Sequence, residues 1–586
     1  MYNEFMKPKD ILANLLWFSL FLGFFAFPAQ AITEFTATNE LTYEVNPRGN
    51  GSVNQEISLT NNFSNIFPKE YQLQVIGNKI ENITAFDSKG SILKKVEEFD
   101  DKTVIKLSFN DSVVGKDKQT FFTINYELPN LATKRGQIWE IAIPELGSKD
   151  EFANLKTIIK VPQAFGSLAY SSISPQTEKI IDNQLVLTYN KNQLGNNPIL
   201  LAFGEFQIFD FDLDFTLINQ TNQVVTKTVP IPPETSYQSV FLTGITPKPT
   251  KIAYDEDYNW LAYYQLSPGQ VIEINVQGQA KIYSRPENKN ITELNRASSL
   301  TPYLKDDEYW QVNSPIIQNI ADYFSNPKQI YNFVIDELEY DFENLTNTER
   351  LGAVETYEQK KGVCTEFSDL FITLARANQI PARELEGFAF TENKELFTLA
   401  AENDVLHSWV EYWDSNKNLW VPADPTWAKT TEGIDFIDDF DLGHFAFVIH
   451  GHSSTNPAPP GFYKTTNNQK KNVKVNFAEK LVPPPDPKLE PNISKNEIII
   501  KNNSFSPIYQ VKVILHGWNS KKTETKTVEG LPPLGEASFE IEEPGFWARL
   551  FQKSTYKIEI NNKKFELNYP RKKLNFFDIF ANLWPG

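Results

Sequence analysis

Apolar and polar residues alternate in short runs between residues 32 and 204, and Gly, Asn, Asp or Pro separates the runs. Residues 40–46 and 52–60 are two such runs, and the turn-forming residues between them predict a hairpin. Many short strands at this spacing are typical of a β-sandwich. The pattern therefore predicts a β-sandwich domain at residues 32–204.

A second β-rich domain is predicted at residues 205–300. Over residues 209–217, Phe or Leu alternates with Asp or Thr, which is the pattern of a strand with one buried face. The carboxylates of Asp210, Asp212 and Asp214 are of the type that Ca²⁺ prefers. Alternation alone explains them as the solvated face of an outer strand, and this is the favoured interpretation.

The apolar spacing changes to three and four residues beyond Thr301, which predicts helices. Residues 316–324 fit one helix, and Asn326 followed by proline predicts the N-cap of a second helix that runs through Leu338. A third helix is expected to begin at Cys364, because apolar residues from position 367 to 375 recur on one face.

Strand-like runs follow these helices at residues 405–413, 419–423 and 445–450. Helices followed by strands indicate an α+β unit, predicted at residues 301–452. The stretch 453–491 is rich in Pro and predicts a semi-extended linker. Residues 492–570 predict a small immunoglobulin-like β-sandwich.

The two ends of the chain have their own patterns. Lys7 and Lys9 precede an apolar run, and Ala29-Gln30-Ala31 resembles a cleavage site, so residues 1–31 predict a signal peptide. An uncleaved membrane anchor is the alternative, and either one predicts export to the cell surface or beyond. The tail 571–586 joins three basic residues to an apolar segment that could contact a membrane or dock on the protein.

Composition narrows the classes of partner. The chain has 586 residues, a formal net charge of −18 and 13% aromatic residues. Nucleic acid is not expected as a partner because it requires clustered Lys and Arg. The length predicts several domains, and nothing in the sequence indicates an oligomeric state.

Cys364 is the single cysteine of the chain, so no disulfide can form within it. A thiol in the first turn of a helix lies at the positive end of the helix dipole, which favours the thiolate. The alternative is an ordinary buried cysteine that acts as a small hydrophobe. Partners elsewhere in the chain decide between these two interpretations.

His407 begins a predicted strand, and Asp424 ends the strand that returns antiparallel to it. If Trp413 pairs with Asn418, His407 lies opposite Asp424, at a Cβ separation of roughly 4.5–5.5 Å. A carboxylate at that distance can orient the imidazole, which can then accept a proton from Cys364. The backbone N–H of Cys364 is the expected oxyanion donor.

Two further clusters suggest metal sites. His444, His450 and His452 fit a buried strand with a histidine at each end, and they lack a Cys, Asp or Glu in ligand spacing. A second cluster consists of acidic residues that match no calcium-binding spacing and are interpreted as a solvated acidic loop: Asp435, Asp438, Asp439 and Asp441. The sequence therefore assigns no metal and no cofactor.

Four motifs resemble the transglutaminase-like superfamily in order and spacing. They are Gly-Val-Cys-Thr-Glu-Phe at 362–367, Ile-Pro-Ala-Arg at 380–383, His-Ser-Trp-Val-Glu at 407–411 and Asp-Pro-Thr-Trp at 424–427. The resemblance covers about residues 309–450, and it implies a papain-like α+β core with Cys364, His407 and Asp424 as the catalytic triad. Thr365 follows the cysteine where animal transglutaminases have tryptophan, which is more similar to the microbial branch. Gln379 stands in place of the family's usual glycine before Ile-Pro-Ala-Arg.

This resemblance implies an exported cysteine enzyme that acts on amide bonds of proteins or peptides, with the cell envelope as one source of substrate, by hydrolysis or by cross-linking. The fold class expected is multidomain, with β-sandwiches flanking a central papain-like domain. The alternative is a non-catalytic cell-surface scaffold or adhesion protein that retains only the fold. An intact Cys, His and Asp favours the enzyme, because a scaffold has no physical need for all three.

Overall fold

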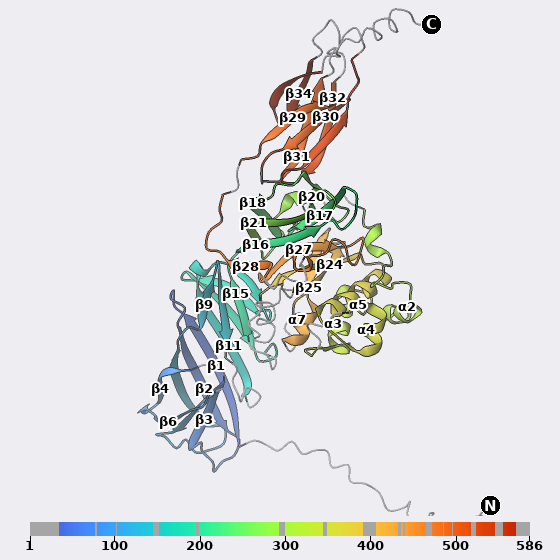
Figure 1. The fold of residues 1–586 in the computed structure, drawn as a ribbon. Helices are drawn as coiled ribbons and strands as arrows, with labels where there is room; N and C mark the ends of the chain where they lie inside the picture. Colours follow the sequence, from blue (N-terminus) through green and yellow to red (C-terminus); the bar gives the residue numbers. More distant parts are fainter. Residues whose placement is uncertain are drawn as a thin grey trace, which may run out of the picture.

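The computed structural model describes residues 34–569 with gaps at 77–78, 101, 145–151, 195–198, 292–298, 344–348, 391–405, 432–434, 438–439, 464–470, 484–485, 495, 517–522 and 545–554. The predicted signal peptide, the predicted tail 571–586, Asp438 and Asp439 lie outside the described residues. In Figure 1 the N-terminal β unit and the C-terminal β unit lie at opposite ends of the molecule. A second β unit and an α+β unit lie between them.

The first β unit contains the predicted hairpin of β1 and β2, in which Val45 pairs with Gly51. Its large sheet has the order β13-β14-β11-β1-β2-β8-β4-β5, and two smaller sheets have the orders β3-β7-β6 and β12-β15-β10-β9. A single apolar core joins strands of all three sheets. The strands are β1 (Phe35–Val45), β2 (Gly51–Asn61), β3 (Glu70–Ile76), β4 (Glu81–Asp87), β5 (Gly90–Ser91), β6 (Leu93–Glu98), β7 (Lys102–Ser108), β8 (Gln119–Leu128), β9 (Ala132–Arg135), β10 (Ile138–Ile143), β11 (Phe152–Pro162), β12 (Leu168–Ser171), β13 (Thr177–Ile181), β14 (Gln184–Asn190) and β15 (Ile199–Phe203).

The second β unit packs two sheets around Trp260 and the phenylalanines of β16. The sheets have the orders β18-β21-β16-β28 and β17-β20-β19. Their strands are β16 (Phe206–Ile218), β17 (Val225–Ile231), β18 (Gln238–Thr246), β19 (Lys251–Tyr254), β20 (Trp260–Leu266), β21 (Val271–Tyr283) and β28 (Val473–Phe477). Strand β28 comes from the stretch predicted to be a linker, so that prediction is wrong for these five residues. Their alternating Val and Phe side chains pack on β16, and burial of these side chains stabilises the pairing.

The alternating aspartates of β16 face neighbouring polar side chains. The Asn275 side chain donates hydrogen bonds to Asp212 and Asp214 at 2.7 and 2.8 Å, and Lys474 on β28 lies 3.7 Å from both carboxylates. Strand β16 lies between β21 and β28 and is therefore not an edge strand. The Asn275 amide and the Lys474 ammonium group are therefore the partners of these carboxylates, and the contacts do not require a metal ion.

The α+β unit places its helices on one side of a sheet with the order β26-β25-β24-β27. Helix α5 packs on β25 and β24 and carries the longest apolar face of the unit. The Asn326 side chain accepts a hydrogen bond from the Gln329 N–H at 3.0 Å, so the predicted N-cap is present. The elements are α2 (Pro315–Ala321), α3 (Pro327–Glu337), β22 (Glu339–Tyr340), α4 (Ala353–Gln359), β23 (Lys361–Gly362), α5 (Cys364–Ala377), β24 (Ala382–Ala389), β25 (His407–Asp414), β26 (Leu419–Ala423), α7 (Pro425–Thr430) and β27 (His444–His450).

The hairpin of β25 and β26 is formed as predicted, but its register differs by two residues. Trp413 pairs with Trp420 rather than with Asn418, and β26 ends at Ala423, so His407 and Asp424 are not directly opposite. Because side chains alternate with period two, a shift of two residues keeps both side chains on the same face. The predicted contact therefore survives as a diagonal one.

The second β unit covers the free edge of β27. The side-chain amide of Gln238 bonds both the N–H and the C=O of Ala446, each at 2.9 Å. The Asn259 amide does the same for Ile449, at 2.8 Å. These two side-chain amides form the hydrogen bonds to the β27 backbone that a further strand would otherwise form. The position of β27 is therefore fixed from both sides.

The C-terminal unit is a small sandwich of two sheets, with the orders β29-β30-β33 and β32-β31-β34-β35. It meets the second β unit through a hydrogen bond from the Tyr509 hydroxyl to Glu234. Its strands are β29 (Leu489–Ser494), β30 (Glu497–Asn502), β31 (Ile508–His516), β32 (Thr523–Leu531), β33 (Glu536–Glu540), β34 (Thr555–Ile560) and β35 (Lys563–Asn568). Among the residues with a described position, no helix is long and apolar enough to cross a membrane.

Candidate active site

Cys364 is the first residue of α5, as the sequence predicts, and its side chain is partly exposed. The Glu366 carboxylate closes the start of the helix by accepting hydrogen bonds from the N–H groups of Val363 and Leu351, at 3.1 and 3.3 Å. Gly362 leaves room for this carboxylate, since a Cβ there would lie 2.4 Å from the Glu366 Cβ. The N–H of Cys364 has no acceptor within the helix. The thiol and this free N–H therefore lie at one fixed position.

Helix α5 and strand β25 are joined next to the two reactive side chains. Ser368, one turn beyond Cys364, and Ser408, adjacent to His407, have hydroxyl oxygens 2.9 Å apart. Ser408 also donates to the buried Glu384 carboxylate at 2.7 Å. These buried contacts hold the start of β25 against the first turns of α5. They bring His407 to Cys364.

His407 lies between the Asp424 carboxylate and the Cys364 thiol. Its Nε2 is 2.7 Å from the Asp424 Oδ2, and its ring is a hydrogen-bond neighbour of Cys364. Burial lowers the pKa of His407, but the Asp424 charge and the bonds to Asp424 and Cys364 outweigh burial and raise it to about 9. The imidazole is therefore protonated at neutral pH.

Asp424 is fully buried and serves as the N-cap of α7. Its Oδ1 accepts the Trp427 N–H at 3.0 Å, which leaves Oδ2 for histidine. Burial alone would raise the pKa of Asp424, but the charge and hydrogen bond of His407 hold it far below its usual value. An ionised carboxylate only accepts hydrogen bonds, so the His407 Nε2 carries a proton and Nδ1 faces the thiol.

His444 is a second histidine on the same carboxylate. Its Nε2 lies 3.1 Å from the Asp424 Oδ2, and its Nδ1 lies 2.6 Å from the Asp441 Oδ1. The sequence placed His444 at the end of a buried strand, which is where it lies, but indicated no contact with Cys364, His407 or Asp424. It also placed Asp441 in a solvated acidic loop. No local sequence pattern identifies His444 and Asp441 as neighbours of Asp424. His444 contacts Asp424, and Asp441 contacts His444, only in the folded chain.

His407, Asp424 and His444 carry donor atoms of the kinds that bind metal ions. The donor atoms of His407, Asp424 and His444 lie within 4.8 Å of one another. Each imidazole Nε2 there already donates a hydrogen bond to the carboxylate, and His444 bonds Asp441 through its other nitrogen. The observed contacts are those of protonated imidazoles, so we assign the group to hydrogen bonding. His450 and His452 are elsewhere, bonded to Glu384 and Asp257.

Tyr340 is a further polar residue beside the thiol. It pairs with Gly362 in the short parallel contact of β22 and β23, and its ring contacts Phe367 on α5. Burial raises the pKa of its hydroxyl, and the nearby charges of Cys364 and Asp424 raise it further. The hydroxyl therefore keeps its proton and can donate a hydrogen bond. The sequence contains no motif that identifies this residue.

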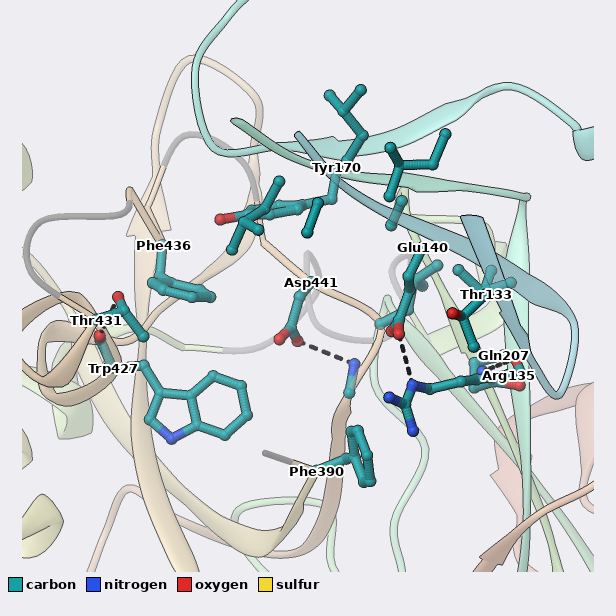
Figure 2. Close-up of a pocket in the computed structure, with 18 of the residues that line it drawn as sticks. Thr133, Arg135, Glu140, Tyr170, Gln207, Phe390, Trp427, Thr431, Phe436 and Asp441 are labelled. Carbon is teal, nitrogen blue, oxygen red and sulfur yellow. Dashed lines mark hydrogen bonds and ion pairs between the residues drawn. The ribbon is translucent and has the colours of Figure 1, made fainter. Parts of the chain in front are cut away.

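A cavity of about 410 Å³ lies next to the site, between the first β unit and α7 (Figure 2). Trp427 and Phe436 line one side, while Arg135 and Glu140 of the first β unit line the other as an ion pair of 2.7 Å. The Trp427 ring also lies 5.3 Å from the His407 ring. One side chain therefore separates the cavity from His407.

The structure thus brings together all three residues that the sequence selects, Cys364, His407 and Asp424. It adds His444, Asp441 and Tyr340 around them. The arrangement places a thiol, an imidazole and a carboxylate in contact in that order. Such a set suits attack of a thiol on a carbonyl carbon.

Solved structures offer only distant similarity. A proposed cysteine protease from Cytophaga hutchinsonii is 16% identical, with a TM-score of 0.31, and the match covers 47% of this chain and 98% of that one. A proposed protease from Parabacteroides distasonis is 10% identical, with a TM-score of 0.17, and covers 67% and 70%. A proposed nutrient-binding protein from Legionella pneumophila is 8% identical, with a TM-score of 0.21, and covers 30% and 68%. These TM-scores are too low to carry an argument.

No curated protein matches the chain. The sequence model of the transglutaminase-like superfamily matches residues 311–425. That range begins before α2 and ends just after Asp424, so it contains Cys364, His407 and Asp424. The multidomain, β-rich chain therefore contains a transglutaminase-like domain, as its four sequence motifs predict.

Proposed function

We propose that the chain is an exported cysteine enzyme that acts on amide bonds of proteins or peptides by thiol acyl transfer. The observation that carries the proposal is the position of His407, between the Cys364 thiol and the Asp424 carboxylate. Asp424 holds Nε2–H of His407, so Nδ1 is the atom that exchanges a proton with the thiol. The same arrangement has no purpose in a purely structural domain.

The first half-reaction forms a thioester. His407 carries its second proton on Nδ1 as an imidazolium, and the Cys364 sulfur attacks the amide carbonyl carbon as the thiolate paired with it. The oxyanion accepts a hydrogen bond from the Cys364 N–H, and the Tyr340 hydroxyl is available as a second donor. Collapse of the tetrahedral intermediate breaks the C–N bond, and the leaving amine takes the proton from His407 Nδ1.

The second half-reaction consumes the thioester. Neutral His407 accepts a proton from water or from a primary amine, which attacks the carbonyl carbon. When the C–S bond breaks, Cys364 leaves as the thiolate beside the His407 imidazolium. Water gives a free acid, and an amine gives a cross-linked amide. A polypeptide of the cell envelope is the substrate class that fits the predicted export.

The activation of Cys364 can be tested without a known substrate. We expect iodoacetamide to alkylate Cys364 in the full chain at pH 6 at least about tenfold faster than it alkylates a peptide of residues 358–370, because the peptide thiol lacks an imidazolium partner. His407→Gln should remove the difference. Mass spectrometry of the alkylated chain and of the alkylated peptide gives the two rates, since each contains a single cysteine. A native thiol that reacts no faster than the peptide would contradict the proposal.

The pH dependence should separate the two roles of His407. Its pKa is raised to about 9, so it is protonated below that pH and loses its proton above it. Release of the amine requires the proton, whereas alkylation requires only the thiolate. We expect kcat/KM for a peptide amide to fall above pH 9, while the alkylation rate does not fall. Turnover that still rises at pH 10 would exclude His407 as the acid.

A further inference from the structure

We infer that His444 is a positioning residue. It holds the Asp424 carboxylate in place, and this carboxylate in turn sets the orientation of the His407 ring. The inference rests on the proposed function. The residues involved form one continuous chain of contacts, from Asp441 through His444, Asp424 and His407 to Cys364. His444 is the only member that contacts two carboxylates among the residues described.

The Asp424 Oδ2 atom is shared by two imidazole rings. It accepts from His407 at 2.7 Å and from His444 at 3.1 Å, while Oδ1 accepts from the Trp427 N–H. The three donors come from three different elements, so together they oppose rotation of the carboxylate about its C–C bond. Without His444, each carboxylate oxygen would have a single donor, His407 on Oδ2 and the Trp427 N–H on Oδ1, and Oδ2 would be held only by the ring that it has to orient.

The contacts of His444 identify its protonation state. Both of its ring nitrogens face carboxylate oxygens, which only accept hydrogen bonds, so both nitrogens carry protons. Burial lowers the pKa of His444, but Asp441 and Asp424 raise it to about 9. His444 is therefore an imidazolium at neutral pH. Its charge compensates the charge that Asp424 brings into the buried site.

Packing leaves His444 no other position. The residue is 3% exposed, and its ring lies between Trp427, at 4.4 Å, and Phe440, at 4.5 Å. Its backbone pairs with Ala389 of β24 at the start of β27. The Asp441 Oδ1 also accepts the Gly443 N–H at 2.9 Å, which fixes the carboxylate that holds Nδ1 (Figure 2). The ring is thus held rigidly against Asp424.

Two substitutions separate the hydrogen bond from the charge. In His444→Gln, the side-chain amide can place an N–H where Nε2 was and keep the bond to Asp424. In His444→Asn, the shorter amide reaches only toward Asp441. Both variants remove the same positive charge, so any difference between them reports the bond to Asp424.

We expect His444→Gln to keep the iodoacetamide rate at pH 6 within about threefold of the wild-type rate, and His444→Asn to lower it about 10- to 100-fold, the range found for supporting hydrogen bonds. Histidine-selective NMR should also give a lower pKa for His407 in the Asn variant than in the Gln variant. The chain has five histidines, which makes assignment by substitution practical. Equal alkylation rates and equal His407 pKa values in the two variants would overturn the inference.

The NMR comparison does not depend on the reactivity of Cys364. If the wild-type thiol shows no enhanced alkylation, the proposed function fails, and the His407 pKa difference still decides the role of His444. Asp441→Asn provides a variant with less risk to folding, because Asp441 is 21% exposed. It should lower the pKa of His444 from about 9 toward its ordinary value, and an unchanged pKa would contradict the chain of contacts.

Discussion

Replacement of Cys364 by serine is expected to lower turnover of any amide substrate at least about 10⁴-fold, the scale of loss when a catalytic nucleophile is removed. Serine is close in size to cysteine and is well tolerated at the start of a helix, so the fold should be unchanged. The hydroxyl cannot replace the thiol, because an alcohol does not form the anion that His407 stabilises. Turnover of a fluorescent peptide amide, with the unfolding temperature as the structural check, measures the effect.

Thr365→Ser is the matched control, since it alters the adjacent residue in the same helical turn. This variant should retain activity within a few-fold of wild type. Equal turnover by wild type and the Cys364→Ser variant would show that the reaction does not use the thiol. If no amide is turned over and alkylation is not enhanced, the non-catalytic scaffold becomes the better explanation.

Replacement of Arg350 by methionine is expected to destabilise the transglutaminase-like domain by about 3–5 kcal/mol, the usual cost of breaking a buried ion pair. Arg350 bonds both oxygens of Asp369, at 2.9 and 2.5 Å, and Glu384 at 3.0 Å. Asp369 is completely buried and Glu384 nearly so. Without Arg350, Asp369 would lose its cationic partner and Glu384 would keep only His450, and neither would gain water. Scanning calorimetry of the full chain measures the shift of this domain's transition.

The surface pair of Lys417 and Asp414 is the control for the Arg350 prediction. Its ammonium and carboxylate groups are 3.5 Å apart, and Lys417 is 61% exposed. Lys417→Met should therefore change the free energy of unfolding by less than about 1 kcal/mol. The double variant Arg350→Met, Asp369→Asn should recover part of the loss, because it removes the buried carboxylate that Arg350→Met leaves without a cation. A single variant as stable as Lys417→Met would contradict the prediction.

The local parts of the site could be predicted from the sequence because their causes are local. The start of α5 at Cys364 follows from the apolar spacing of residues 367–375 and from Gly362. The hairpin of β25 and β26 follows from two apolar runs around a polar turn. Its register was predicted two residues away from the observed one, since turn geometry sets register and the sequence leaves the turn type open.

The ion network under the site could not be predicted in this way. Arg350 precedes α4, Asp369 lies on α5 and Glu384 on β24, and their sequence separations of 19 and 34 residues follow no period. Burial raises the pKa of Asp369 to about 7 even beside Arg350, which shows how much charge the core must compensate. Such contacts exist only after helix and sheet have packed.

The sequence by itself determined the position of the Cys364 thiol at the head of an amphipathic helix, the His and Asp of the adjoining hairpin, and the β-rich, multidomain plan. Each follows from spacing within a few tens of residues, where helix and strand periods restrict which side chains can meet. Only the tertiary structure decided that His444 and Asp441 join Asp424, and that β28 belongs to the second β unit. The partners in these contacts come from separate elements, and burial brings them together only when the chain has folded.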